Sequence, residues 1–392
     1  MKNRYRTLVR VSVLTVIAMS MSLSASAGNK DRSGQAACAF LLYNPWASTN
    51  GWGTAGISHT KGIEATFSNV AGMAFTKKTE IAYSNTMYMF QSKTNINSIG
   101  IVQNLGETKS GGERGNLGAT VMVMNSGKIP ITTVEQPEGG LGYFTLSMMN
   151  IGLSYARSFS DQVHAGVTVN VNNQKAKDVS ATGFTINLGI QYVTGKNDQY
   201  QIGVAIRNFG LPLKYKGDGM SLRANLPGNT FVSSLLIATE ESEMPVLLAL
   251  GTSYDFLFGE KTKSESIPGR KVSRADAMHR ITLAGAFIAN AYSQDQIIFG
   301  IEYSLLDYFQ VRGGYTIQGP LYKFDEFKKD KDGNPKAKNT YATNFAGPSV
   351  GTSILIPLKK GGVGPSRLAI DYSYRFTIEY GGCHAIGARL IL

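Results

Sequence analysis

The chain has 392 residues, of which 43% are hydrophobic, only 17% are charged and 44 are glycine. This charge content is low for a soluble enzyme, and it indicates that part of the surface faces something other than water. The formal net charge is +12, and it falls to +8 without the four basic residues among the first 27. That excess is too mild to indicate nucleic-acid binding.

Residues 1–27 have the features of a secretory signal peptide. A basic start ends at Arg10, an apolar run follows from Val11 to Leu23, and Ala25-Ser26-Ala27 forms a small-residue cleavage site before Gly28. We therefore expect the protein to be exported. No later stretch approaches the roughly 18 to 20 consecutive apolar residues of a membrane-spanning helix, so a membrane-embedded form of this chain has to be a β-barrel.

Alternation of apolar and polar residues predicts strands along most of the chain after residue 78. Residues 162–172 show it most clearly, with valine or alanine at every second position and mostly polar residues between. Such two-faced stretches of about ten residues are typical of barrel strands that separate lipid from a lumen. About fifteen candidates occur, and we expect an even number near fourteen to be real. The candidates are 79–91, 95–106, 116–125, 142–158, 162–172, 184–192, 200–207, 229–240, 245–257, 281–287, 297–303, 309–315, 349–358, 366–377 and 382–392.

The predicted fold is therefore all-β, a transmembrane antiparallel barrel over residues 79–392. A soluble β-sandwich also alternates, but it rarely sustains so many strands in one chain. The last strand favours the membrane alternative, because the alternate residues from 384 to 392 form one largely apolar face up to the terminus. We expect the protein to lie in the bacterial outer membrane after export.

Three stretches do not alternate. Residues 28–78 precede the first convincing strand, and we expect a luminal plug or a periplasmic segment there. Residues 259–278 and 320–345 are polar and lysine-rich, which is typical of long loops. Since outer-membrane barrels have short periplasmic turns and long outer loops, we place both loops on the cell exterior.

No set of residues points to catalysis. Gly51–Gly56 matches the letters of a dinucleotide-binding loop, but a turn rather than a strand leads into it, so we interpret these glycines as turns or close backbone packing. No histidine has a second ligand at metal-binding spacing. The four histidines are His59, His164, His279 and His384. We therefore expect no catalytic residue, metal or cofactor, and a protein that is not an enzyme.

Two residue pairs stand out. Glu302 and Arg312 fall on the polar faces of neighbouring strands, and a turn over 306–308 places them opposite each other, which predicts a luminal ion pair that braces the wall. Cys38 and Cys383 are the only cysteines of an exported chain. They form a candidate disulfide if the N-terminal segment threads up into the lumen, and two free, buried thiols are the alternative.

Several short motifs together resemble the PorV/PorQ family of outer-membrane barrels, which is akin to the FadL-type fatty-acid transporters. The N-terminal part supplies three of them, and two pairs of later strands supply the rest. They are Cys38–Leu42, Gly51–Gly56, Ser68–Phe75, Gly300–Tyr303 with Val311–Tyr315, and Asp371–Tyr374 with His384–Gly387. The chain departs from the family pattern at Val70, where proline is usual, and at Leu392, where an aromatic residue is usual.

The resemblance implies a FadL-like barrel of fourteen strands in a Bacteroidota-type bacterium that works with the type IX secretion system. The implied partners are the translocon barrel, the C-terminal domains of secreted cargo and a surface sortase, with outer-membrane lipid and lipopolysaccharide around the wall. The loop 320–345 is the candidate partner-binding loop, because aromatic residues are interleaved with charges there. The candidate residues are Tyr322, Phe324, Phe327, Lys328 and Lys329.

Two alternatives stay open. A FadL-like transporter of hydrophobic small molecules would use the long N-terminal segment as a hatch, although polar residues such as Asn170 and Gln201 line the predicted inner face. A purely structural or weakly porous barrel would have neither protein partners nor a plug.

Overall fold

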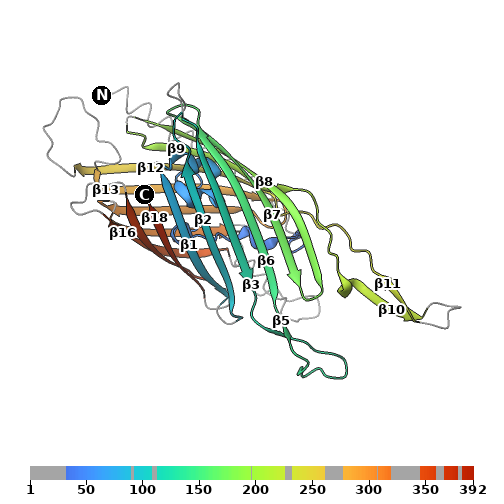
Figure 1. Cartoon of the computed structure of the whole chain (residues 1–392). Coiled ribbons are helices and arrows are strands. Elements are labelled where there is room, and N and C mark those ends of the chain that lie inside the picture. Colours follow the sequence, from blue (N-terminus) through green and yellow to red (C-terminus); the bar gives the residue numbers. More distant parts are fainter. Residues whose placement is uncertain are drawn as a thin grey trace, which may run out of the picture.

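The computed structural model is a closed antiparallel barrel of fourteen strands (Figure 1), which confirms the predicted fold class. It describes residues 32–89, 92–107, 113–195, 197–225, 232–260, 277–306, 308–318, 345–358, 366–377 and 382–392. The barrel strands are β1 (Thr79–Met89), β2 (Thr94–Asn104), β3 (Asn116–Asn125), β6 (Leu146–Ser158), β7 (Val163–Ala176), β8 (Val179–Thr194), β9 (Tyr200–Gly210), β12 (Leu247–Glu260), β13 (Ala277–Asn290), β14 (Gln296–Leu305), β15 (Phe309–Gln318), β16 (Gly347–Pro357), β17 (Arg367–Arg375) and β18 (Cys383–Ile391). Each pairs with the next along the chain, and β18 closes the barrel against β1. The predicted signal peptide lies outside the described residues.

The one candidate strand that does not join the wall is 229–240. Within it, β11 (Val232–Leu236) pairs with β10 (Ser221–Asn225) in a separate two-stranded hairpin between β9 and β12. At five residues β11 is too short to cross a bilayer, since a spanning strand needs about nine. A second small hairpin, β4 (Ile129–Pro130) with β5 (Tyr143–Phe144), lies between β3 and β6.

The alternating residues have the orientation expected of a membrane barrel. In β7, Val169 and Val171 are exposed on the outside, whereas Thr168, Asn170 and Asn172 are buried on the inside. The pattern holds in β18 as well. An apolar outer face with polar groups turned inward suits a wall that contacts lipid. No helix in the described part of the chain has the length and apolarity needed to cross a bilayer.

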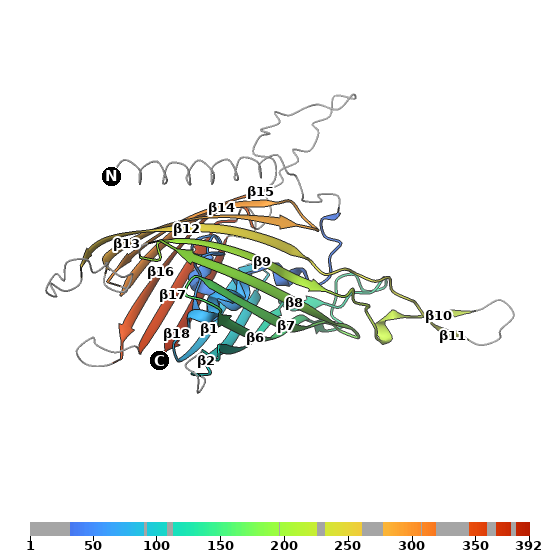
Figure 2. The same ribbon diagram turned by 90° about the horizontal axis from the view of Figure 1, so that it is seen from above.

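The connections differ in length at the two ends of the barrel. One end carries the three longest connections, 126–145, 211–246 and 319–346. Because outer-membrane barrels have their long loops on the outside, we call this end the outer mouth. The C-terminal residue lies at the opposite end, which we call the inner end. The β10–β11 hairpin projects beyond the outer mouth (Figures 1 and 2). The expectation that both lysine-rich loops lie outside is wrong for 259–278. Three antiparallel strands, β13 to β15, lie between 259–278 and 320–345 in the chain, and each strand crosses the barrel once. The two stretches therefore connect strands at opposite ends of the barrel.

Residues 32–78 occupy the lumen as a plug that runs from the outer mouth to the inner end (Figure 2). The N–H of Ala37 bonds Glu243 O at the mouth (2.9 Å), and Asn116 Nδ2 donates to Met73 O near the inner end (2.9 Å). The plug consists of short helical turns. They are η2 (Ala39–Leu42), α2 (Ala47–Asn50), η3 (Gly62–Glu64), α3 (Ala65–Ser68) and η4 (Val70–Phe75).

Backbone approach explains one pair of glycines. A Cβ atom on Gly51 would lie 2.8 Å from the Cα of Gly351 in β16, so the plug and the wall touch without side chains between them. This contact fits the interpretation of Gly51–Gly56 as close packing rather than a cofactor loop.

Candidate functional site: the plugged lumen

Buried ion pairs form a belt around the inner half of the lumen. Glu302 on β14 accepts hydrogen bonds from Arg312 Nε on β15 at 2.6 Å and from Arg280 Nη2 on β13 at 3.1 Å. The predicted partners, Glu302 and Arg312, are therefore in register and bonded, and Arg280 is a third member that sequence reasoning missed. Arg280 lies opposite Ser304 on β14, two residues from Glu302, and this diagonal spacing becomes readable only once the register is known.

The belt continues onto the plug through Arg389. Arg389 on β18 donates two hydrogen bonds to Asp371 on β17, at 2.7 and 3.0 Å, and its Nη1 lies 3.7 Å from Glu64 Oε2 in the plug. Ser353 connects the two halves, because it accepts a hydrogen bond from Arg312 and donates one to Asp371. Ion pairs and hydrogen bonds therefore connect six neighbouring strands, β13 to β18, and end on the plug.

A second contact fixes the plug beside the first. The N–H of Ile63 donates to Glu80 Oε2 on β1 at 3.1 Å. Ile63 and Glu64 are adjacent in η3, so one helical turn engages both β1 and β18, the pair of strands that closes the barrel. The plug is thereby held at the seam of the wall.

Large apolar side chains of the plug fill the space around this belt of ion pairs. Trp46 and Trp52 are each 2% exposed, and Ile57, Ile63 and Met73 are fully buried. Trp52 packs with Ile57 against alanines of β9, β12 and β13. The described part of the lumen is thus packed like a protein core.

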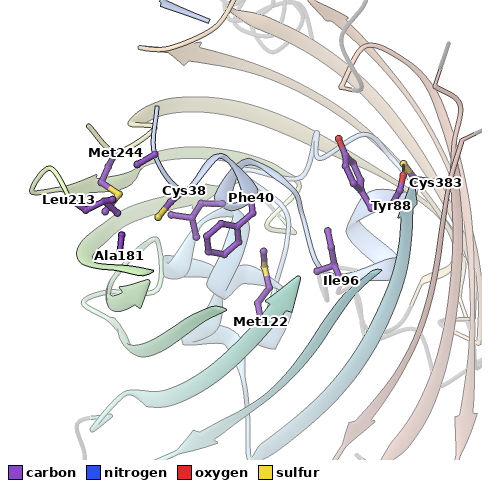
Figure 3. Close-up of a cluster of buried hydrophobic side chains, with 11 residues drawn as sticks. Cys38, Phe40, Tyr88, Ile96, Met122, Ala181, Leu213, Met244 and Cys383 are labelled. Atoms are coloured by element: carbon purple, nitrogen blue, oxygen red, sulfur yellow. Dashed lines mark hydrogen bonds between the residues drawn. The ribbon is translucent and has the colours of Figure 1, made fainter. Parts of the chain in front are cut away.

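An apolar cluster lies where the plug meets the outer mouth (Figure 3). Phe40 lies in its middle, with Met122 of β3, Met244 and Leu213 of the β9–β12 connection, and Ile96 of β2. The plug, the wall and an outer connection therefore share one small core at this end.

Both cysteines belong to the cluster, and both are free thiols. Cys38 is beside Met244 and Leu213, whereas Cys383 lies across the lumen beside Tyr88 (Figure 3), whose carbonyl accepts its S–H at 2.9 Å. The structure therefore has the free-thiol alternative and not the disulfide, because the side chains of the cluster separate the two sulfur atoms. Burial raises the pKa of the Cys38 thiol to about 12.

Apolar residues are exposed on the outer hairpin. The β10–β11 strands pair only with each other in the described part of the chain, and Leu236 and Ile237 are 77% and 53% exposed. A two-stranded sheet with unpaired edges and an exposed leucine side chain is suited to pairing with a strand of another chain. Sequence reasoning treated this segment as one more barrel strand. The five residues chosen in loop 320–345 lie outside the described residues, but the flanking Gln318 and Phe345 are at the same mouth.

The fold and the lumen define a plugged fourteen-stranded β-barrel of the outer-membrane type. No known family profile and no curated protein matches the chain. Solved structures do resemble it, among them three at 12% sequence identity. The Ralstonia pickettii toluene transporter TbuX has a TM-score of 0.49 over 89% of this chain and 97% of that one. The Pseudomonas putida toluene transporter TodX has a TM-score of 0.48 (88% and 96%), and a Pseudomonas aeruginosa FadL homologue has 0.43 (88% and 96%).

Proposed function

We propose that this barrel is a docking component of a protein-secretion machinery in the outer membrane, and that its outer mouth binds the partner. One observation carries the proposal. Side chains of the plug fill the lumen, and buried ion pairs hold the plug to the wall. The β10–β11 hairpin, by contrast, has unpaired strand edges and an exposed Leu236 outside the wall. A platform with a fixed plug suits the binding of proteins at its rim better than the passage of molecules through its centre.

The finer assignment rests on the motif resemblance. It makes the partners a type IX translocon barrel, the C-terminal domains of secreted cargo and a surface sortase complex. Strand addition to the hairpin is the recognition mode that we expect for a cargo β-domain, because main-chain hydrogen bonds supply affinity and neighbouring side chains supply selectivity.

Single substitutions on the hairpin test this proposal. Tagged barrel is extracted from native membranes in mild detergent, and retained proteins are identified by mass spectrometry. Leu236→Asp should remove the translocon barrel or cargo domain. Val134→Asp, on the outer connection 126–145 and 98% exposed, is the matched control and should leave the partner bound. Equal partner recovery from both variants would refute the role of the hairpin.

The second candidate is transport of hydrophobic small molecules. The apolar cluster around Phe40 at the outer mouth favours it, because such a molecule needs an apolar first site. Two of the solved structures above are described as toluene transporters. Recovery of a partner-free barrel that carries hydrophobic small molecules, and loses them in Phe40→Asn, would favour this candidate over docking.

A further inference from the structure

Two lysines and a serine form a row on the wall at the outer mouth. Lys175, near the end of β7, lies opposite Ser180 of β8, and Ser180 in turn lies opposite Lys216 in the connection after β9. Two backbone hydrogen bonds of 2.8 Å join Ser180 to Lys216. Residues directly opposite each other on antiparallel strands point to the same face, so the three side chains share one face. We call these three residues the lysine row.

The lysine row points away from the lumen. Gln174, which precedes Lys175, is buried on the lumen side. It accepts a hydrogen bond from the Tyr215 hydroxyl at 2.6 Å, so Tyr215 points inward as well. Because successive side chains of a strand point to opposite faces, Lys175 and Lys216 point outward, and both are exposed.

Neither lysine of the row has a carboxylate within ion-pair distance among the described residues. The neighbouring lysines do, since Lys214 Nζ lies 3.0 Å from Glu241 Oε1 and Lys177 Nζ lies 3.9 Å from Asp178 Oδ2. Asp218, further along the same connection, pairs with neither lysine of the row. Two ammonium groups on backbones about 10 Å apart therefore flank one hydroxyl on the outside of the wall.

The outer face of the wall becomes apolar on the side of the row that leads toward the inner end. Val171 of β7 and Phe184 of β8 lie opposite each other, four residues from Lys175 and Ser180, and are 37% and 59% exposed. Phe209 of β9 follows beside them and is 62% exposed. Four residues span about 13 Å of strand, or roughly 10 Å along the membrane normal at a tilt of about 40°. A lysine side chain reaches back from there to the lipid headgroups.

We propose that the lysine row binds the phosphate of an outer-leaflet lipid, whose acyl chains lie along this apolar face. The anionic phosphate would accept hydrogen bonds from both ammonium groups and from the Ser180 hydroxyl. The position of the row selects a lipid as the occupant, because the row continues directly into the surface that contacts acyl chains. The site goes beyond the docking proposed for the hairpin and does not depend on it.

Lipid titration of the full mature barrel in non-ionic detergent, read by native mass spectrometry, tests the proposal. The probes are diphosphoryl lipid A, the same lipid after enzymatic removal of its phosphates, and inorganic phosphate. The phosphorylated lipid should bind at least about tenfold more tightly than the dephosphorylated one, since each lysine near the surface contributes about 1 kcal/mol. This difference should shrink as the salt concentration rises, because salt screens exposed charges.

Variants separate recognition of the phosphate from general contact with lipid. The double variant Lys175→Gln/Lys216→Gln should weaken binding of the phosphorylated lipid at least about tenfold. Replacing both lysines with arginine should preserve binding, because arginine also donates to phosphate. Arg157→Gln is the matched control, since it removes one exposed charge from the outside of β6 near the inner end, and it should bind the lipid as wild type does. Because both lysines are exposed, all these variants should fold with an unchanged unfolding temperature.

Four results would overturn the assignment. They are equal binding of the lipid with and without its phosphates, unchanged binding in the double glutamine variant, an equal loss of binding in Arg157→Gln, and displacement of the lipid by an equal concentration of inorganic phosphate. The last result would make the row a general anion site rather than a lipid site. If the double variant fails to fold, the single variants Lys175→Gln and Lys216→Gln decide by the same criteria.

Discussion

Replacing Arg389 with methionine should release the plug from the wall. Arg389 makes two hydrogen bonds to Asp371, at 2.7 and 3.0 Å, and lies 3.7 Å from Glu64 in the plug. At an effective dielectric constant of about 20, an ion pair at 3.7 Å is worth about 4 kcal/mol. Loss of one partner of a buried ion pair costs about 3–5 kcal/mol, because the carboxylates stay buried without their cation.

The two tryptophans make the plug visible on its own. Trp46 and Trp52 are the only ones in the chain, both lie in the plug, and both are buried. Urea titration followed by tryptophan emission therefore reports the plug, and circular dichroism reports the strands. With an m value of about 1 kcal/mol/M for so small a unit, the emission midpoint of Arg389→Met should fall by about 3 M or more.

Arg32→Met is the matched control for this experiment. Arg32 pairs with Glu243 at 3.1 Å, but both side chains are largely exposed, and such pairs contribute about 0–1 kcal/mol. The emission midpoint should then move by less than about 1 M. An Arg389→Met curve that coincides with that of the wild type would refute the inference that the belt holds the plug.

Three further predictions follow from the lumen. Cys38 and Cys383 should both resist maleimide in the folded barrel at pH 8 and react after denaturation without reductant. Because the pKa of Cys38 is raised to about 12, only roughly one Cys38 side chain in a thousand is a thiolate at pH 9, so it should stay almost unlabelled at pH 7 and at pH 9. Quantitation of fewer than two thiols would contradict the free pair. Gly351→Val should lower the free energy of unfolding by about 1–3 kcal/mol and shift tryptophan emission to the red, because its Cβ would lie 2.7 Å from the Cα of Gly51 in the plug. Gly313→Ala is the control and should behave as wild type, since the nearest atom to its Cβ would be 3.7 Å away. Glu302→Gln should lower by several degrees the temperature at which the folded band disappears in gel-shift assays, because the buried Arg280 and Arg312 lose their carboxylate. An unchanged temperature would show that these ion pairs are dispensable for stability.

The strands of the wall are predictable from the sequence because each carries its own period. Val169 and Asn170 are neighbours in the chain, so their side chains point to opposite faces of a strand. Because lipid lies outside the wall and the lumen is polar, Val169 faces outward and Asn170 faces inward. The one false barrel strand, 229–240, had the right composition but not the length to pair across a bilayer. Composition alone does not separate a wall strand from an outer hairpin.

The plug and its contacts could not be predicted in the same way. Its turns are short, three to six residues each, so they carry no helical period from which a buried face can be read. The contact of Glu64 with Arg389 joins residues more than 300 positions apart, and it depends on closure of the barrel by β1 and β18. The lysine row could not be predicted either, because Lys216 lies in a connection without a strand period, and only its bridge to Ser180 places it in one row with Lys175.

The most direct test of the docking proposal is site-specific photo-crosslinking from the hairpin in the native host. A photoreactive residue replaces Leu236 in one strain and Val134 in another, since both positions are exposed on outer connections. We predict a covalent adduct with the translocon barrel or a secreted C-terminal domain from position 236 and none from position 134. Adducts that contain only lipid, or no adduct at position 236 in a folded barrel, would contradict the proposal.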